Sequence, residues 1–231
     1  CVIHAVSTVN PGNSNEVYMH GYGRELLQTI KLCNMLVDTD TRMIFLSSGG
    51  TVYGDHKKQP IDEGVLPTPI NHYGNIKLCI ENTLRTFNYQ KGTQFIIARI
   101  SNPYGPGQDF HKGVGFIDAV LKSTMLGIPV EIWGDGENVR DYVYIDDVCE
   151  MLECLIRETF NVSSGKGYTQ NAVIEVLKVM GLYPEVNYKN KRSVDVRKII
   201  LSNARMHNLW KQNPIGLEEG IRRYYRYLQG E

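Results

Sequence analysis

The sequence has little that would point to a membrane, a nucleic acid or a metal. Its 25 basic and 25 acidic residues leave a net charge of zero, so charge offers no case for binding nucleic acid or a membrane surface. No apolar run approaches the roughly 20 residues of a membrane span. The five cysteines are scattered, and they form neither a disulfide framework nor a metal-ligand spacing. We therefore expect a cytoplasmic protein with no metal site.

Hydrophobic residues make up 42% of the chain and charged residues 22%, which is ordinary for a globular protein. Strand and helix patterns alternate in the first hundred residues, with strands at 1–6, 43–46 and 93–99 and helices at 24–38 and 73–91. No hairpin turns separate them, and this order predicts parallel crossovers in a doubly wound α/β (Rossmann) sheet.

Beyond residue 100 the predicted elements are short and mixed. Two of them, at 130–133 and 139–144, flank a Gly134-Asp135-Gly136 turn. We expect residues 1–108 to form most of a Rossmann domain, to which elements around 139–165 return. Residues 109–231 are then expected to form a smaller, mixed α/β substrate domain.

Candidate chemistry follows the second strand. That strand ends at Ser47 and Ser48, and ligands of open α/β sheets bind beyond the carboxyl ends of the strands. In the next helix Tyr73 and Lys77 are four residues apart and share one face. A nearby ammonium favours the charged form of a phenol and lowers its pKa from about 10, which suits proton transfer. The alternative is a solvated pair at a helix start.

The spacing Tyr-x-x-x-Lys also occurs at Tyr53 and Lys57. That match lies in a loop after a strand, where nothing forces the two side chains together, so we interpret it as coincidence.

Six segments, taken in order, resemble the extended short-chain dehydrogenase/reductase family, specifically NAD-dependent nucleotide-sugar epimerases of the UDP-glucose 4-epimerase type. Each segment alone is a weak signal, but their order and spacing together are specific. The segments are Val-Ile-His-Ala at 2–5, Ser-Ser-Gly-Gly-Thr-Val-Tyr-Gly at 47–54, Tyr-Gly-Asn-Ile-Lys at 73–77, Ala-Arg-Ile-Ser-Asn-Pro-Tyr-Gly-Pro-Gly at 98–107, Val-Arg-Asp-Tyr-Val-Tyr-Ile-Asp-Asp-Val at 139–148, and Arg-Ser-Val-Asp at 192–195.

The resemblance implies NAD as the cofactor and a UDP-hexose as the substrate. Tyr73, as phenolate, would take the proton of the sugar 4-hydroxyl while the C4 hydride passes to the nicotinamide. The 4-keto sugar would turn over, and the hydride would return to its other face. The resemblance also implies a homodimer formed through the helices at 24–38 and 73–90.

The resemblance also implies roles for individual residues. The catalytic set is Tyr73, Lys77, Ser48 and Thr51. The cofactor set is Val6, Ser7, Ser47, Tyr73, Lys77 and Pro103. The substrate set is Asn102, Phe116, Glu131, Trp133, Arg140, Arg192 and Asp195. For the arginines the chemistry agrees, because a guanidinium fork suits diphosphate oxygens. The alternatives are that Trp133 belongs to a core and Arg192 to a solvated charged run.

Three departures from the family pattern bear on these expectations. Gly49 stands where the family usually has a hydroxyl, so Ser48 or Thr51 must supply it. His20 stands near the family's asparagine on the cofactor side. No Gly-x-x-Gly-x-x-Gly loop, which would bind the pyrophosphate, is present. We expect the strands that carry that loop to precede residue 1.

Two alternatives to an epimerase remain open once elimination reactions are set aside. Sugar dehydratases and decarboxylases of this family carry a glutamate where this chain has Thr51, and elimination needs a positioned acid, so these reactions are disfavoured. A nucleotide-sugar reductase or dehydrogenase with net redox is the second hypothesis. An inactive binding relative is the third.

Overall fold

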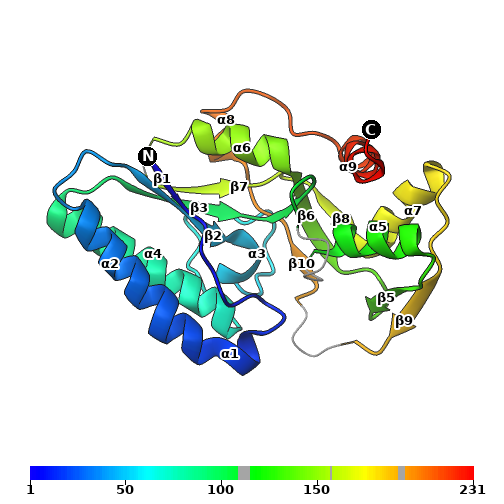
Figure 1. Cartoon of the computed structure of the whole chain (residues 1–231), viewed down its shortest axis with the longest axis horizontal. Helices are drawn as coiled ribbons and strands as arrows, with labels where there is room; N and C mark the ends of the chain where they lie inside the picture. Colours follow the sequence, from blue (N-terminus) through cyan, green and yellow to red (C-terminus); the bar gives the residue numbers. More distant parts are fainter. Residues whose placement is uncertain (109–114, 157, 192–195) are drawn as a thin grey trace.

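Four parallel strands form the sheet on which the first half of the chain is built. The computed structural model describes residues 1–108, 115–156, 158–191 and 196–231. In it the strand order is β1 (Val2–His4), β2 (Met43–Ser48), β3 (Phe95–Ile100) and β7 (Thr159–Val162) (Figure 1). The predicted α/β fold with a parallel sheet is confirmed.

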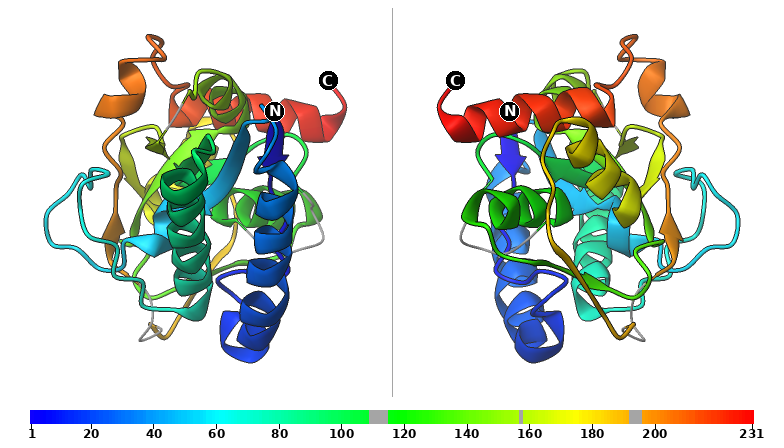
Figure 2. Two further views of the ribbon diagram at one scale, coloured as in Figure 1. Left: turned by 90° about the vertical axis from the view of Figure 1, so that its left-hand side faces the viewer. Right: turned by 90° about the vertical axis from the view of Figure 1, so that its right-hand side faces the viewer.

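Helices cover both faces of this sheet. On one face lie α1 (Ser14–His20), a π-helical turn η1 (Gly21–Glu25), α2 (Leu26–Leu36) and α4 (His72–Lys91). Figure 2 shows α2 and α4 side by side. On the other face lie α6 (Ile145–Glu153) and α8 (Ala204–His207). Because side chains alternate along a strand, Phe45 and Ile97 pack under α4, and Ile44 and Ile96 pack under α6.

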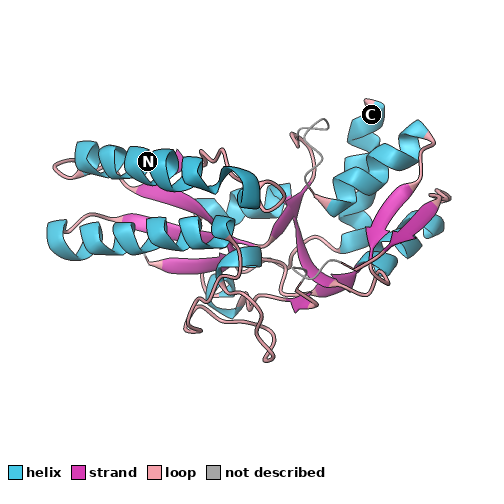
Figure 3. Ribbon diagram, turned by 90° about the horizontal axis from the view of Figure 1, so that it is seen from below, coloured by secondary structure: helices cyan, strands magenta, loops and turns pink. Residues whose placement is uncertain are grey.

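The second half of the chain is built on different strands. One sheet joins β4 (Asn102–Tyr104), β6 (Val139–Tyr144), β8 (Gly167–Thr169) and β10 (Lys198–Ile199), and a separate pair joins β5 (Val130–Trp133) and β9 (Val186–Lys189). A second core lies among α5 (Phe116–Leu126), α7 (Gln170–Val179) and α9 (Leu217–Gln229). Figure 3 shows helices gathered at the end of the molecule where the C-terminus is marked.

The two strands predicted on either side of the 134–136 turn do not pair with each other. β5 pairs with β9, whereas β6 pairs with β4, β8 and β10. Gly134 and Gly136 both have positive φ, at 92° and 76°, and they turn the chain from one sheet to the other. Since β7 returns to the first sheet and β6 does not, the division of the chain into two domains near residue 108 stays a proposal.

A buried ion pair crosses from α4 to the first sheet. Arg99 on β3 and Glu81 on α4 are 1% and 0% exposed, and Arg99 Nη2 lies 2.6 Å from Glu81 Oε2. Ser47 Oγ donates to the same carboxylate at 2.7 Å, and the half-exposed Arg85 pairs with it at 2.8 Å. These contacts hold in place the face of α4 that also carries Tyr73 and Lys77.

The described helices also bear on the question of a membrane. None of them combines the length and the apolar composition that crossing a membrane requires.

Candidate active site

The start of α4 is fixed against the tip of β2. The side chain of Asn71 caps the helix by accepting a hydrogen bond from the backbone N–H of Gly74 at 2.8 Å. A Cβ at Gly74 would lie 2.6 Å from the carbonyl oxygen of Thr51, so only glycine permits this approach of α4 to the short helix α3 (Gly49–Val52). The approach brings the first turn of α4, and with it Tyr73, to the carboxyl end of β2.

The structure brings Tyr73, Lys77 and Ser48 together at that edge. The Ser48 side chain acts on the Tyr73 phenol and lowers its pKa. Lys77 Nζ lies 5.5 Å from the centre of the Tyr73 ring and 5.0 Å from the centre of the Phe45 ring. The helical spacing thus places both side chains in one compartment, as predicted.

The prediction that the pKa of the Tyr73 phenol lies below its usual value is wrong. Burial, the largest influence, raises the pKa of Tyr73 to about 12, and the hydrogen bond from Ser48 counters it. Burial also lowers the pKa of Lys77. The ammonium lies over the face of the ring, 5.5 Å from its centre, and its charge is not among the influences that set the pKa of the phenol.

Ser48, rather than Thr51, supplies the hydroxyl at the phenol. Thr51 Oγ1 is buried and has no hydrogen-bond partner in the part of the chain that the structure describes. Position 49 offers no room for one, because a Cβ there would lie 2.2 Å from Leu201 Cδ1 and 3.0 Å from the carbonyl oxygen of Arg99. The packing around position 49 therefore has room for glycine but not for the hydroxyl residue that the family usually has there.

Ser48→Ala and Thr51→Val should separate the two hydroxyls. The alanine variant loses a hydrogen bond that favours the charged phenol, which is worth about 1.5–3 kcal/mol, so turnover should fall about 10- to 100-fold. The valine variant keeps the shape of Thr51 and removes an unpartnered atom, so turnover should change little. Steady-state kinetics of both variants make the comparison, and a larger loss in Thr51→Val would contradict our assignment.

Gly49→Ser, which restores the family's hydroxyl, should damage the protein rather than improve it. The added side chain overlaps Leu201 and the backbone of β3, and overpacking of this kind costs about 1–3 kcal/mol. Chemical denaturation measures the free energy of unfolding. A variant as stable as the parent would show that position 49 has space that the structure does not give it.

The predicted cofactor residues lie in or shortly after β1, β2 and β3, or in α4. Val6 and Ser7 follow β1 and are exposed, as is Pro103 in β4. Ser47 needs a correction, because its hydroxyl is buried under α4 and donates to Glu81 at 2.7 Å. Its side chain is therefore not available to a cofactor, and the reason is the alternation of side chains along β2.

Lys77 fits the role predicted for it at a ribose. The residue is 3% exposed, and its ammonium carries three donors. In the described part of the chain it makes one hydrogen bond, a long one of 3.4 Å to the carbonyl oxygen of Leu46. Two donors thus remain for the hydroxyls of a ligand.

The predicted substrate residues lie on the strands of the second half. Asn102 Nδ2 donates to the carbonyl oxygen of Asp141 at 3.0 Å, and Arg140 Nη1 donates to that of Val139 at 2.9 Å. Glu131 pairs with Lys189 at 3.2 Å across β5 and β9. Trp133 is 38% exposed, so it is not a core residue.

The remaining substrate residues have different outcomes. Phe116 opens α5 and packs, half-buried, against the core of the second half. Arg192 and Asp195 lie outside the described residues, and their predicted roles stay predictions.

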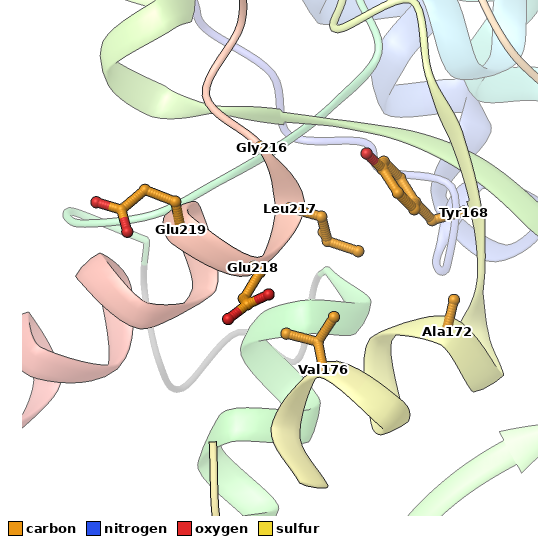
Figure 4. A pocket seen from close by; sticks show the side chains of 7 residues that line it. All are labelled: Tyr168, Ala172, Val176, Gly216, Leu217, Glu218 and Glu219. Atoms are coloured by element: carbon orange, nitrogen blue, oxygen red, sulfur yellow. The ribbon is translucent and has the colours of Figure 1, made fainter. Parts of the chain in front are cut away.

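The rest of the described chain bears on two further questions, pockets outside this site and groups that could bind a metal. A hollow between α7 and α9, lined by Tyr168, Val176, Leu217 and neighbouring residues, contains none of the predicted site residues (Figure 4). No group of three or more His, Cys, Asp or Glu side chains in the described residues could hold a metal ion.

Sequence reasoning missed two buried acids beside the site, Glu25 and Glu81. Glu81 continues the stripe of Tyr73 and Lys77 by one more helical turn, and that spacing could have indicated it. Glu25 sits in the π-helical turn η1, whose irregular geometry no pattern in the sequence predicted.

Comparison with known proteins defines the class to which this chain belongs. A model of the NAD dependent epimerase/dehydratase family matches residues 1–169. The chain belongs to this family, and the predicted resemblance to extended short-chain dehydrogenases/reductases is confirmed, together with NAD as the family's cofactor.

Individual relatives are nucleotide-sugar enzymes. The UDP-glucose 4-epimerase of Thermotoga maritima, solved with UDP-glucose, is 30% identical with a TM-score of 0.93, over 99% of this chain and 77% of that one. The Thermus thermophilus UDP-glucose 4-epimerase in complex with NAD is 27% identical with a TM-score of 0.92, over the same shares. A dTDP-4-dehydro-6-deoxyglucose reductase of Escherichia coli is 30% identical over 95% of this chain and 72% of its own length.

A further relative, from Methanocaldococcus jannaschii, is 32% identical over 99% of this chain and 76% of its own length. Its name assigns it only provisionally as a UDP-glucose 4-epimerase.

Proposed function

We propose that this protein is an NAD-dependent epimerase that inverts C4 of a UDP-hexose through a transient 4-keto sugar. The observation that carries the proposal is the phenol of Tyr73 at the carboxyl end of β2, with the Lys77 ammonium 5.5 Å from the centre of its ring and with Ser48 lowering its pKa. Relatives named as UDP-glucose 4-epimerases over almost the whole chain support it.

Tyr73 is the group that moves the proton. Its raised pKa keeps the proton on the phenol at neutral pH, which suits donation to the oxygen of a 4-keto sugar. Taking the proton from the sugar 4-hydroxyl needs the phenolate, which the hydrogen bond from Ser48 favours. When bound, oxidised NAD would supply the hydride acceptor, and its positive charge would also favour the phenolate.

The remaining residues bind and orient the cofactor and the nucleotide sugar. Lys77 offers two donors to a ribose, and we propose that Val6 and Ser7, which follow β1, and Pro103, which follows β3, contact the cofactor. On the substrate side we propose that Asn102, Phe116, Glu131, Trp133 and Arg140 hold the nucleotide sugar. The half-buried guanidinium fork of Arg140 suits its diphosphate, with Arg192 and Asp195 as further members.

The test is to incubate the protein with UDP-galactose and NAD and to follow the formation of UDP-glucose. Interconversion without net reduction of NAD supports the proposal. No conversion of UDP-galactose, UDP-glucuronate or their N-acetylated counterparts would contradict it.

The second candidate is a nucleotide-sugar reductase. It is favoured by the 30% identity to a dTDP-4-dehydro-6-deoxyglucose reductase. Stoichiometric oxidation of NAD(P)H by a 4-keto sugar nucleotide would select it, because an epimerase regenerates its cofactor in each turnover.

We further propose a homodimer formed through α2 and α4. Leu27 and Met35 on α2 are 52% and 75% exposed, which is apolar surface of the kind that an interface covers. Light scattering should give twice the mass of the chain, and a monomer at micromolar concentration would contradict this.

A further inference from the structure

Asp141 is a buried carboxylate to which the proposed chemistry gives no part. It lies in β6 and is 0% exposed. Its Oδ1 accepts hydrogen bonds from Ser101 Oγ at 3.4 Å, from Ser164 N at 3.0 Å and from Ser164 Oγ at 2.7 Å. Its Oδ2 accepts from the backbone N–H groups of Gly165 and Leu201, each at 3.2 Å. So many donors on one carboxylate fix the segments that carry them.

This arrangement suits the ionised side chain. Burial raises the pKa of Asp141 to about 6, and the hydrogen bonds from Ser164, Leu201 and Gly165 lower it. At mildly alkaline pH the carboxylate is therefore charged, and it then offers acceptor oxygens and no donor of its own.

The donors come from strand ends that belong to both sheets. In the first sheet Ser48, Ile100 and Val162 pair in one row across β2, β3 and β7. The donors at 101, 164 and 165 come directly after that row, whereas Leu201 comes shortly after β10, which pairs with β6. The Asp141 carboxylate thus joins strand ends of both sheets beside Ser48.

Leu201 carries this contact to the tip of β2. Its Cδ1 lies 2.2 Å from where a Cβ at Gly49 would be, so its side chain packs against the residue that follows Ser48. Because Asp141 accepts from the N–H of Leu201, it fixes the residue that packs against this tip.

Asp141 is also joined to the predicted substrate residues. Its backbone carbonyl oxygen accepts from Asn102 Nδ2 at 3.0 Å, and Arg140 precedes it in β6. Asn102 lies close to the tip of β2 as well, since a Cβ at Gly50 would be 3.9 Å from its Oδ1. One residue therefore contacts both the tip of β2 and the strand that carries the proposed substrate residues.

We propose that Asp141 is a positioning residue for the substrate side of the site. Its carboxylate holds the ends of β3, β7 and β10 together, and it thereby sets where Asn102 and Arg140 stand relative to Ser48. The inference rests on the proposed function, because that function assigns Asn102 and Arg140 to the nucleotide sugar.

The experiment compares Asp141→Asn with Asp147→Asn. Asp147 on α6 is a matched control, because it is 4% exposed and accepts a backbone hydrogen bond from Ile215 N at 2.7 Å. In Asp141→Asn the new amide turns a donor toward N–H groups that need an acceptor. The Kd for UDP, measured by isothermal titration calorimetry, should therefore rise about 10-fold, as expected for the loss of one hydrogen bond to a charged group. Asp147→Asn should leave that Kd unchanged.

The side-chain amide of Asn102 gives a second readout that needs no ligand. Its NMR signals, assigned by their loss in Asn102→Asp, should move in Asp141→Asn and stay in place in Asp147→Asn. A merely structural Asp141 would lower the melting temperature of its variant and leave both the Kd for UDP and the Asn102 signals where they are. That result would overturn the proposal.

Should Asp141→Asn not fold, Ser164→Ala decides in its place. It removes the shortest of the five hydrogen bonds and keeps the carboxylate, so it should move the Asn102 signals and raise the Kd for UDP by a smaller factor. Unchanged signals would again overturn the proposal.

The inference and the proposed function can fail separately. A protein that shows both shifts but converts no UDP-hexose refutes the proposed function and leaves this inference standing. If the parent binds no UDP, the proposed substrate is wrong, and the Asn102 signals alone decide whether Asp141 positions that side chain.

Discussion

Tyr73→Phe should abolish epimerisation almost completely while leaving the fold and the bound cofactor in place. The phenol lies at the carboxyl end of β2 with Ser48 on its hydroxyl and Lys77 over its ring. A positioned acid–base group contributes about 10²- to 10⁴-fold to turnover, so kcat should fall by that factor. Because the ring remains, its packing against the core under α4 is kept.

Tyr53→Phe is the matched control, since Tyr53 also begins a Tyr-x-x-x-Lys match. Its hydroxyl is buried and donates to Asn161 Oδ1 at 2.7 Å, under the guanidinium of Arg99. Removing that hydroxyl should cost about 1 kcal/mol of stability and leave turnover within about twofold. If Tyr73→Phe kept more than a tenth of the parent kcat, another group would be moving the proton.

Glu81→Gln should be the most destabilising of these substitutions. It removes the charge that pairs with Arg99, whose side chain is 2% exposed, and leaves that guanidinium buried without compensation. Breaking a buried pair in this way costs about 3–5 kcal/mol. Denaturant unfolding should show the loss at pH 7.

The double variant Glu81→Leu/Arg99→Met is the control, because it removes both charges. Apolar replacements of a buried pair are often close to neutral, so the double variant should be more stable than Glu81→Gln. Arg85, which is 40% exposed at its side chain, can turn to solvent when its partner is lost. A double variant less stable than the single one would contradict our account of this pair.

The fold could be predicted because its signals are local and periodic. The apolar runs of β2 and β3, and the helical face that carries Ile76, Ile80 and Leu84, are buried as such patterns require. Asn71 and Gly92 mark the ends of α4 by capping it and by adopting a left-handed conformation. In the second half the pairing of β5 with β9 joins segments far apart in the sequence, and no local pattern predicts it.

The site could be predicted in part for the same reason. Tyr73 and Lys77 meet because a helical turn forces them together, which sequence spacing shows. The pKa of Tyr73 depends on burial from several elements at once, so spacing predicted its direction wrongly. Ser47 and Ser48 are neighbours in sequence, yet their side chains alternate along β2, and which of them faces Glu81 on α4 depends on how the strand packs.

The most direct measurement of the central claim uses a UDP-hexose with deuterium at C4. If Tyr73 removes the hydroxyl proton while the C4 hydride leaves and returns, the product should retain the deuterium at C4 in the opposite configuration, with no net change in NAD. Loss of the label to water, or its transfer to a released reduced cofactor in stoichiometric amount, would contradict the proposed epimerisation.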